Sequence, residues 1–216
     1  MGFALRTFGV MVSMAAASLA LPASAQDAQP DRLRGQITRI DATSMLLKTV
    51  EGRTVRVGLP DNVTLFSLSK ASFADADFGT YVGAVSRKMP GNIYSPIYRD
   101  SLVWLHQGFE LRIIDEKLRG IAVGLTKWDL TPDSVMTHGW IDDLEERVMS
   151  IKFGPTEEEE TDVEITRDVP ITKMSFGERS QLTPGARVLA GALKRADGSY
   201  VAQFIFVGRD GIVPPM

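Results

Sequence analysis

The chain has no cysteine among its 216 residues, and it has only two histidines. Without cysteine there can be no disulfide, no thiolate metal site and no cysteine nucleophile. The sequence also lacks the GxSxG turn of serine hydrolases, the phosphate loop and the dinucleotide fingerprint. These absences remove most of the common routes to catalysis. We therefore expect a protein that is not an enzyme and that carries no cofactor.

Long apolar runs are also scarce, and the one that is present lies at residues 8–21. It follows Arg6 and precedes Ala23, Ser24 and Ala25. A basic start, an apolar stretch and a small-x-small motif are typical of a secretory signal peptide, here residues 1–25. A retained membrane anchor is the less favoured alternative, because a spanning helix needs ~20 apolar residues. We expect cleavage near Ala25, a periplasmic mature protein and no membrane span after cleavage.

Excess positive charge is absent too, since 24 basic residues face 27 acidic ones and give a net charge of −3. Loss of Arg6 with the leader would leave 23 basic and 27 acidic residues, a net charge of −4. A negative chain does not attract nucleic acid or anionic membrane surfaces. The expected partner is therefore an envelope protein or a small ligand.

What the sequence does contain is an internal repeat. Residues 57–82 match residues 163–188 at a constant offset of 106. The matching pairs are Val57 and Val163, Val63 and Val169, Leu65 and Ile171, Gly79 and Gly185, and Val82 and Val188. Upstream, Gly35 and Gly139, Ile37 and Ile141, and Lys48 and Lys152 match at an offset of 104. Such self-similarity indicates two copies of one small fold.

Each copy reads as three short strands, a short helix and two more strands, and in the first copy the helix is expected at residues 69–77 and the final strand at residues 101–106. Alternation of apolar and polar residues, with Asp197-Gly198 as a hairpin signal, supports the strands. This order predicts an all-β chain with two five-stranded OB-like barrels, at residues 32–107 and 134–211. Two open sheets packed as one sandwich are the alternative. A partly helical linker is expected at residues 108–133, with a helix over 109–118.

Metal binding is a weaker possibility, based on the two histidines. His106 and His138 lie at comparable edges of the copies and could converge with Asp129 or Glu110. Two histidines and a carboxylate form a recognised zinc or iron set. The competing interpretation places each histidine at an exposed strand end. An acidic run, Glu157–Glu160 followed by Asp162, could hold a hard cation or be a solvated loop.

Aromatic residues supply the other candidates for a ligand site or an interface. These are Trp104, Trp128 with the adjacent Asp129, and Trp140. A buried Trp128 that pins the linker between the copies is the simpler interpretation. The C-terminal tail, residues 212–216, is apolar at Ile212 and Val213, so we expect it to fold back onto the second copy or near Trp128.

Three segments carry a resemblance to a known family: SKASFADADFGTYVGA (69–84), RSQLTPGARV (179–188) and VGRDGIVPPM (207–216). The chain resembles small exported bacterial proteins with two OB-like repeats and no established activity, often labelled "metal ABC transporter permease". The family linker carries Gly-His-Arg-Pro-Trp-Asp, whereas this chain has Gly124-Leu125-Thr126-Lys127-Trp128-Asp129, without the histidine. We therefore expect a non-catalytic binding or interaction module of the cell envelope. A metal-handling accessory protein of a transport system is the alternative.

Overall fold

The computed structural model describes residues 30–91, 93–97, 104–156 and 159–214. The expected signal peptide lies outside these residues. Within them the chain is all-β, as predicted, and its few helical turns are short 3-10 segments. None of the helices in the described part is long and apolar enough to cross a membrane.

The elements follow one another in the same order in both halves. The first half comprises β1 (Asp31–Ile40), β2 (Ser44–Thr49), β3 (Thr54–Gly58), β4 (Thr64–Lys70), η1 (Phe73–Asp75), β5 (Tyr81–Lys88) and β6 (Leu105–Ile114). The connection holds η2 (Glu116–Leu118) and β7 (Gly124–Lys127). The second half comprises β8 (Val135–Glu145), β9 (Val148–Lys152), β10 (Glu160–Glu164), β11 (Ile171–Phe176), η4 (Arg179–Gln181), β12 (Arg187–Lys194) and β13 (Tyr200–Gly208).

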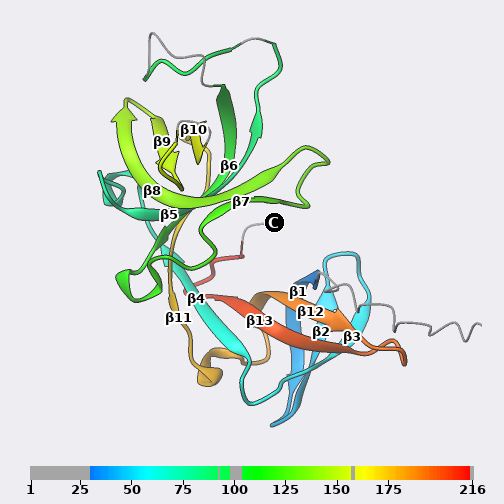
Figure 1. The fold of residues 1–216 in the computed structure, drawn as a ribbon. Coiled ribbons are helices and arrows are strands. Elements are labelled where there is room, and N and C mark those ends of the chain that lie inside the picture. Colours follow the sequence, from blue (N-terminus) through cyan, green and yellow to red (C-terminus); the bar gives the residue numbers. More distant parts are fainter. Residues whose placement is uncertain (1–29, 92, 98–103, 157–158, 215–216) are drawn as a thin grey trace, which may run out of the picture.

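The halves exchange strands, and all 13 strands belong to one sheet. Strands β1, β2 and β3 pair in a closed circuit with β13 and β12 of the other half, which we call ring 1. Strands β8, β9 and β10 close in the same way with β6 and β5, forming ring 2. In Figure 1 ring 1 therefore mixes blue with orange and red, and ring 2 mixes cyan and green with yellow. The expectation of one separate barrel per consecutive segment is corrected to this exchanged arrangement.

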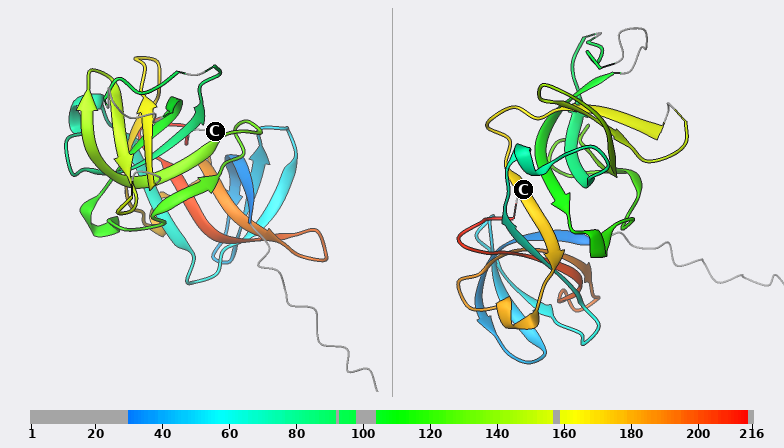
Figure 2. Two further views of the ribbon diagram at one scale, coloured as in Figure 1. Left: turned by 45° about the horizontal axis from the view of Figure 1, so that its top comes forward. Right: turned by 90° about the vertical axis from the view of Figure 1, so that its left-hand side faces the viewer.

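Two strands that the sequence pattern did not predict carry the exchange. Strand β4 runs from ring 1 toward ring 2, β11 runs back, and the two pair antiparallel. Their register is symmetric about Leu68 and Met174, which face each other and are related by the repeat offset. Strand β4 also pairs with β13, and β11 with β6, both parallel. Both views in Figure 2 show the two rings as separate ends of the molecule that this crossing pair joins.

Matching glycines show how closely the second half reproduces the first. A Cβ on Gly35 would lie 2.2 Å from the Lys48 carbonyl oxygen, and one on Gly139 would lie 2.3 Å from that of Lys152. The first strand of each ring can approach its neighbour so closely only because it lacks a side chain there. The repeat seen in the sequence is thus a repeat of backbone geometry.

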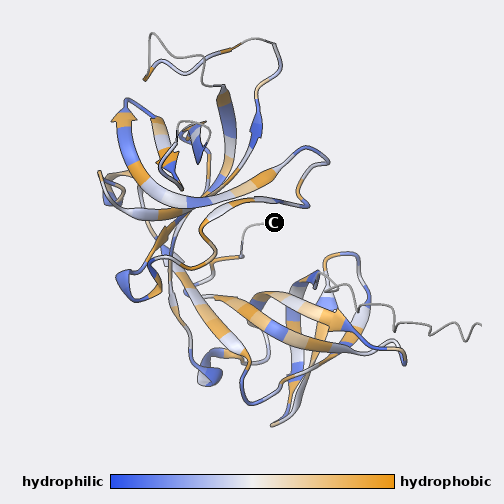
Figure 3. Ribbon diagram, in the orientation of Figure 1, coloured by the Kyte–Doolittle hydropathy of each residue, from blue (hydrophilic) through white to orange (hydrophobic). Residues whose placement is uncertain are grey.

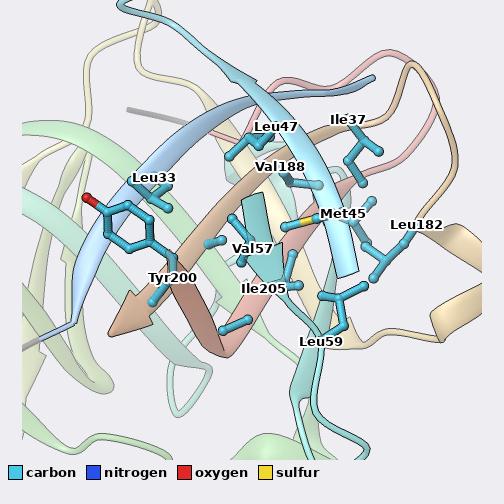
Figure 4. Packing of buried hydrophobic residues seen from close by; sticks show 14 of the residues in the cluster. Leu33, Ile37, Met45, Leu47, Val57, Leu59, Leu182, Val188, Tyr200 and Ile205 are labelled. Carbon is cyan, nitrogen blue, oxygen red and sulfur yellow. The ribbon is translucent and has the colours of Figure 1, made fainter. Parts of the chain in front are cut away.

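Each ring is filled by side chains from both halves. Ring 1 packs Leu33, Ile37, Met45, Leu47 and Val57 against Val188, Ala190, Tyr200 and Ile205 (Figure 4). Ring 2 packs Val82, Ala84, Leu111 and Ile113 against Ile141, Met149, Ile151 and Val163. Apolar residues alternate with polar ones along these strands, as Figure 3 shows, so one face of each strand turns inward. Burying each of these side chains contributes ~1.5–3 kcal/mol to stability. Because both halves supply them, neither ring can form its core without strands from the other half.

The region between the copies departs from the prediction. The expected helix over residues 109–118 is strand β6, followed only by the short η2 turn. Residues 109–114 contain two adjacent β-branched isoleucines, Ile113 and Ile114, which favour a strand over a helix. The expected final strand at residues 101–106 falls partly outside the described residues, and β6 begins at Leu105. The expected helix around residues 69–77 shortens to η1, where Ser72 donates to Asp75.

The C-terminal tail folds back between the rings. Ile212 packs against the apolar cluster that includes Phe66, Leu68 and Tyr81, and Pro214 is buried. A Cβ on Gly208 would lie 1.8 Å from the Ile212 carbonyl oxygen, so this glycine lets the tail turn tightly. Val213, by contrast, is exposed. The tail docks onto the crossing region, as expected in part, and Met216 lies outside the described residues.

Candidate functional site

A hollow in the described residues lies where the crossing pair meets both rings. It has a volume of about 350 Å³, and we call it the central cleft. Its apolar wall comprises Phe66, Ile121, Trp128, Met174, Phe204 and Phe206. Its polar lining comprises Thr64, Arg112, Thr126, His138 and Gln203. A largely apolar hollow with a few convergent polar groups is the usual form of a ligand site.

Three phenylalanines form one wall of the cleft. Phe66 of β4 stacks on Phe206 of β13 at 4.9 Å between ring centroids, and Phe204 meets Phe206 edge-on at 5.6 Å. The end of the Phe204 ring lies over Gly191, where a Cβ would come within 2.1 Å of it. The glycine therefore sets the position of this aromatic ring. The wall is rigid, since its members sit on strands rather than loops.

Beside the phenylalanine wall, β6 carries a buried ion pair, of which Arg112 lines the cleft. Arg112 and Glu110 point the same way, two residues apart on the strand, and the arginine Nε donates to a glutamate oxygen. Both residues are about 1% exposed. Burial raises the pKa of Glu110, and the Arg112 charge only partly opposes this shift. The Arg112 guanidinium also lies 4.7 Å from the ring centre of Phe206, so it packs against the phenylalanine wall.

Polar atoms beside the cleft lack hydrogen-bond partners. Among the described residues these include Arg112 Nη2, Glu110 Oε2, Trp128 Nε1 and His138 Nδ1. A buried donor or acceptor without a partner costs about 1–3 kcal/mol. Buried polar groups in native proteins are almost always satisfied, so such a group needs an explanation. Several of them around one hollow indicate a place where another molecule supplies the missing partners.

The connection between the halves supplies Trp128 to the cleft and carries Asp129 next to it. Trp128 is buried, and the Arg32 guanidinium of β1 stacks on its ring at 3.9 Å. Asp129 accepts two hydrogen bonds from Arg34, at 2.8 and 3.0 Å, and lies 3.5 Å from Arg32. Burial raises the pKa of Asp129, but the bonds and charges of both arginines outweigh it and hold that pKa below its usual range. Trp128 thus fixes the connection to ring 1, as the simpler interpretation predicted.

Three arginine side chains lie around Trp128. Arg32, Arg34 and Arg112 are close enough to influence one another or the same carboxylates. Asp129 and Glu110 form ion pairs with this arginine cluster, and the charge of Arg34 also acts on Glu51. Of the three arginines, Arg112 alone lines the cleft, beside a low-dielectric wall where charge acts strongly.

The two histidines are not brought together. His106 lies opposite Lys88 and His138 opposite Gly83, on the two sides of strand β5. Five residues of strand separate those positions, about 16 Å at ~3.3 Å per residue. Burial, with the charge of Lys88, lowers the pKa of His106 to about 4. Burial, with the charge of Arg112, lowers that of His138 to about 4. Both imidazoles are neutral at pH 7, and only His138 lines the cleft.

The other predicted site residues lie apart from the cleft. Trp104 packs against Tyr94 at 4.9 Å and lies under the Lys88 ammonium at 3.2 Å. Trp140 leans on Tyr81 at 5.4 Å, in the packing between the rings. Of the predicted aromatics, Trp128 alone lines the cleft.

The acidic run is partly outside the described residues, at positions 157 and 158. Glu160 accepts a 2.5 Å hydrogen bond from Ser150. Asp162 is fully buried, and burial raises its pKa to about 6. The described part of the chain contains no group of three or more histidine, cysteine, aspartate or glutamate side chains that could hold a metal ion.

Sequence analysis missed Arg112 and considered Glu110 only as a partner for the histidines. Reading residues 109–118 as a helix placed the two on different faces. Read as a strand, Glu110 and Arg112 share one face, between apolar neighbours. Two opposite charges on one face of an otherwise apolar strand are the signal that could have found the ion pair.

Comparison of the chain with protein-family models, with curated proteins and with solved structures finds no match.

Proposed function

We propose that this protein is a non-catalytic binding module of the cell envelope and that the central cleft is its binding site. The observation that carries the proposal is the set of unpaired buried donors, Arg112 Nη2 and Trp128 Nε1, in an aromatic hollow. A ligand with hydrogen-bond acceptors would remove their cost of about 1–3 kcal/mol each. The envelope location rests on the predicted leader at residues 1–25 and is tested by mapping the N-terminus of the exported chain.

We further propose that the rings are OB-like barrels. The support is the closed pairing order of five strands in each ring, with the third and fifth strands parallel. A short helical turn also precedes the fourth strand in each ring, η1 before β5 and η4 before β12. OB-like barrels serve mainly as scaffolds for binding. The resemblance to exported proteins with two such repeats agrees with this proposal.

The test uses the three tryptophan indoles as reporters. Fragments added to ¹⁵N-labelled protein should shift the Trp128 indole N–H signal and leave those of Trp104 and Trp140 in place. Thr126→Trp should fill the cleft and abolish the shift, because Thr126 is an exposed residue on its lining. Thr54→Trp, the same change at an exposed position of β3, is the control and should keep the shift.

Two results would overturn this proposal. Shifts of the Trp104 or Trp140 signals in place of the Trp128 signal would put the site elsewhere. No shift of any indole with a diverse fragment set at millimolar concentration would leave the cleft without a ligand.

A further inference from the structure

The central cleft has one strongly anion-seeking group that its own ion pair does not satisfy. Arg112 uses its Nε to hold Glu110, and its Nη2 has no partner. A guanidinium is a planar fork that presents several donors in fixed directions, so holding one carboxylate oxygen leaves donors for another anion. Charge-assisted bonds of this type are among the strongest in proteins.

The charges on the lining of the cleft decide the sign and number of charges on the ligand. Arg112 is the one permanently charged side chain among the described residues that line it. His138 adds no charge at pH 7, because burial lowers its pKa. One negative charge on a ligand would pair with the free donor of Arg112. A second negative charge would be buried without a partner, which is costly.

The walls and the volume of the cleft determine the polarity and the size of the uncharged part of the ligand. Phe66, Phe204 and Phe206 present an apolar surface directly beside the guanidinium. The volume of about 350 Å³ lies near the lower end for small-molecule pockets. It suits a compact aromatic or short aliphatic group rather than a whole lipid or a folded protein segment.

We infer that the central cleft selects small apolar molecules with one carboxylate, and that Arg112 is the group that binds the carboxylate. This inference rests on the proposed function, because it names the ligand class of the same site. The apolar body lies on the phenylalanine wall, and the carboxylate takes the free Arg112 donor and the Trp128 indole N–H. No bond is made or broken, so the protein holds such molecules and releases them unchanged.

The experiment compares matched anions and neutral molecules by calorimetry on the purified chain at pH 7. The probes are 1-naphthoate with 1-naphthamide and octanoate with octanamide. Each carboxylate should bind at least tenfold more tightly than its amide. In Glu110→Gln/Arg112→Met, which removes both members of the ion pair and leaves no unpaired charge, the carboxylates should lose at least tenfold in affinity. The amides should change little. Arg187→Met, at an exposed position of β12, is the control and should bind as the parent does.

The other outcomes separate this inference from the proposed function. Equal binding of acids and amides, with the Trp128 signal shifted, would overturn the carboxylate inference and keep the cleft as the site. Tight binding of an apolar tripeptide acid but of neither small acid would overturn it in favour of a peptide chain end. Binding of the acids that survives both Thr126→Trp and the double variant would place them outside the cleft and overturn both proposals.

Discussion

The last strands of the two halves, β6 and β13, occupy equivalent backbone positions but carry side chains of different character. Arg112 of β6 lies opposite Gly83, and Phe206 of β13 lies opposite Leu189, the residue that the repeat relates to Gly83. Glu110 likewise corresponds to Phe204, because their partners Val85 and Gly191 are related by the same offset. One half therefore offers an ion pair where the other offers two aromatic rings.

The difference matters because these equivalent residues meet. Arg112 lies 4.7 Å from the ring centre of Phe206, beside the crossing pair of β4 and β11. A perfectly symmetric protein would place two arginines or two phenylalanines against each other there. Two arginines would repel, and two phenylalanines would give no charge selectivity. Because the two halves carry different side chains where these equivalent positions meet, the hollow there is lined by both aromatic rings and a charged group.

The largest expected effect comes from removing one member of the Glu110–Arg112 ion pair. Arg112→Met leaves Glu110 buried without its partner, and such a change costs about 3–5 kcal/mol of unfolding free energy. Adding Glu110→Gln should recover most of that loss, because no buried charge remains. Urea denaturation of the parent, the single variant and the double variant measures this. A single variant as stable as the parent would show that the pair is not buried as described.

The similarity of the halves can be tested at their closest strand contacts. Gly35→Ala and Gly139→Ala should each cost roughly 2–4 kcal/mol, because a Cβ would overlap a backbone carbonyl in both rings. The two losses should agree within about 1 kcal/mol. Gly58→Ala is the control, since its Cβ would meet nothing closer than 3.5 Å and should cost far less. Thermal or urea unfolding measures all three, and a large loss at only one of the paired glycines would contradict the equivalence.

Acid should destabilise ring 2 more than ring 1, because both histidines lie in ring 2. The folded state lowers the pKa of His138 from 6.5 to about 4, so the unfolded chain binds more protons between these values. The folded state therefore has its full stability with respect to His138 above pH 6.5, and it loses stability as the pH falls toward 4. Relative to His138→Gln, the parent should lose up to about 3 kcal/mol over this range. The raised pKa of Asp162 acts in the opposite direction, so the comparison must be made against the variant.

Hydrogen exchange locates that acid effect. Amides of β8 in ring 2 should lose protection below pH 6 in the parent and lose less of it in His138→Gln, where only His106 still takes up a proton in this range. Ring 1, which contains neither histidine, should change little in both proteins. Equal loss of protection in ring 1 would contradict the assignment of the effect to His138.

The smallest effect is expected at the tail, which only the second half possesses in the described structure. Ile212→Ser removes a partly buried side chain and should cost about 1 kcal/mol, whereas Val213→Ser should leave stability within about 0.5 kcal/mol. Melting temperatures of the two variants measure this. A larger effect at Val213 would indicate that this exposed residue contacts another molecule.

Much of the fold could be predicted from the sequence, since the repeat and the strand alternation are local patterns. The exchange of strands could not. In a consecutive barrel Gln36 would pair with Tyr81, and in the observed sheet it pairs with Arg187, the equivalent residue of the other half. Either copy supplies apolar side chains of the same type to fill a ring, so the core residues do not distinguish the two arrangements. Only the lengths and directions of β4 and β11 decide between the two arrangements, and their alternation was not recognised.

The candidate site was predictable only in part. Trp128 and Asp129 stood out because tryptophan is rare in the chain and because an acid follows it. Arg112 did not stand out, since an arginine in a sequence is usually exposed and solvated. Its importance comes from burial against Phe206, a residue 94 positions away in the chain that the exchange brings to it.

The strand exchange underlies every part of this account, and a single disulfide test addresses it directly. The chain has no cysteine, so Gln36→Cys/Arg187→Cys introduces one isolated pair. These residues are partners on adjacent antiparallel strands, within the Cα separation that a disulfide requires. After mild oxidation of the monomer, peptide mapping should find the 36–187 link, and Gln36→Cys/Tyr81→Cys should give none. A 36–81 link in place of the 36–187 link would contradict the exchange and restore one separate barrel in each half.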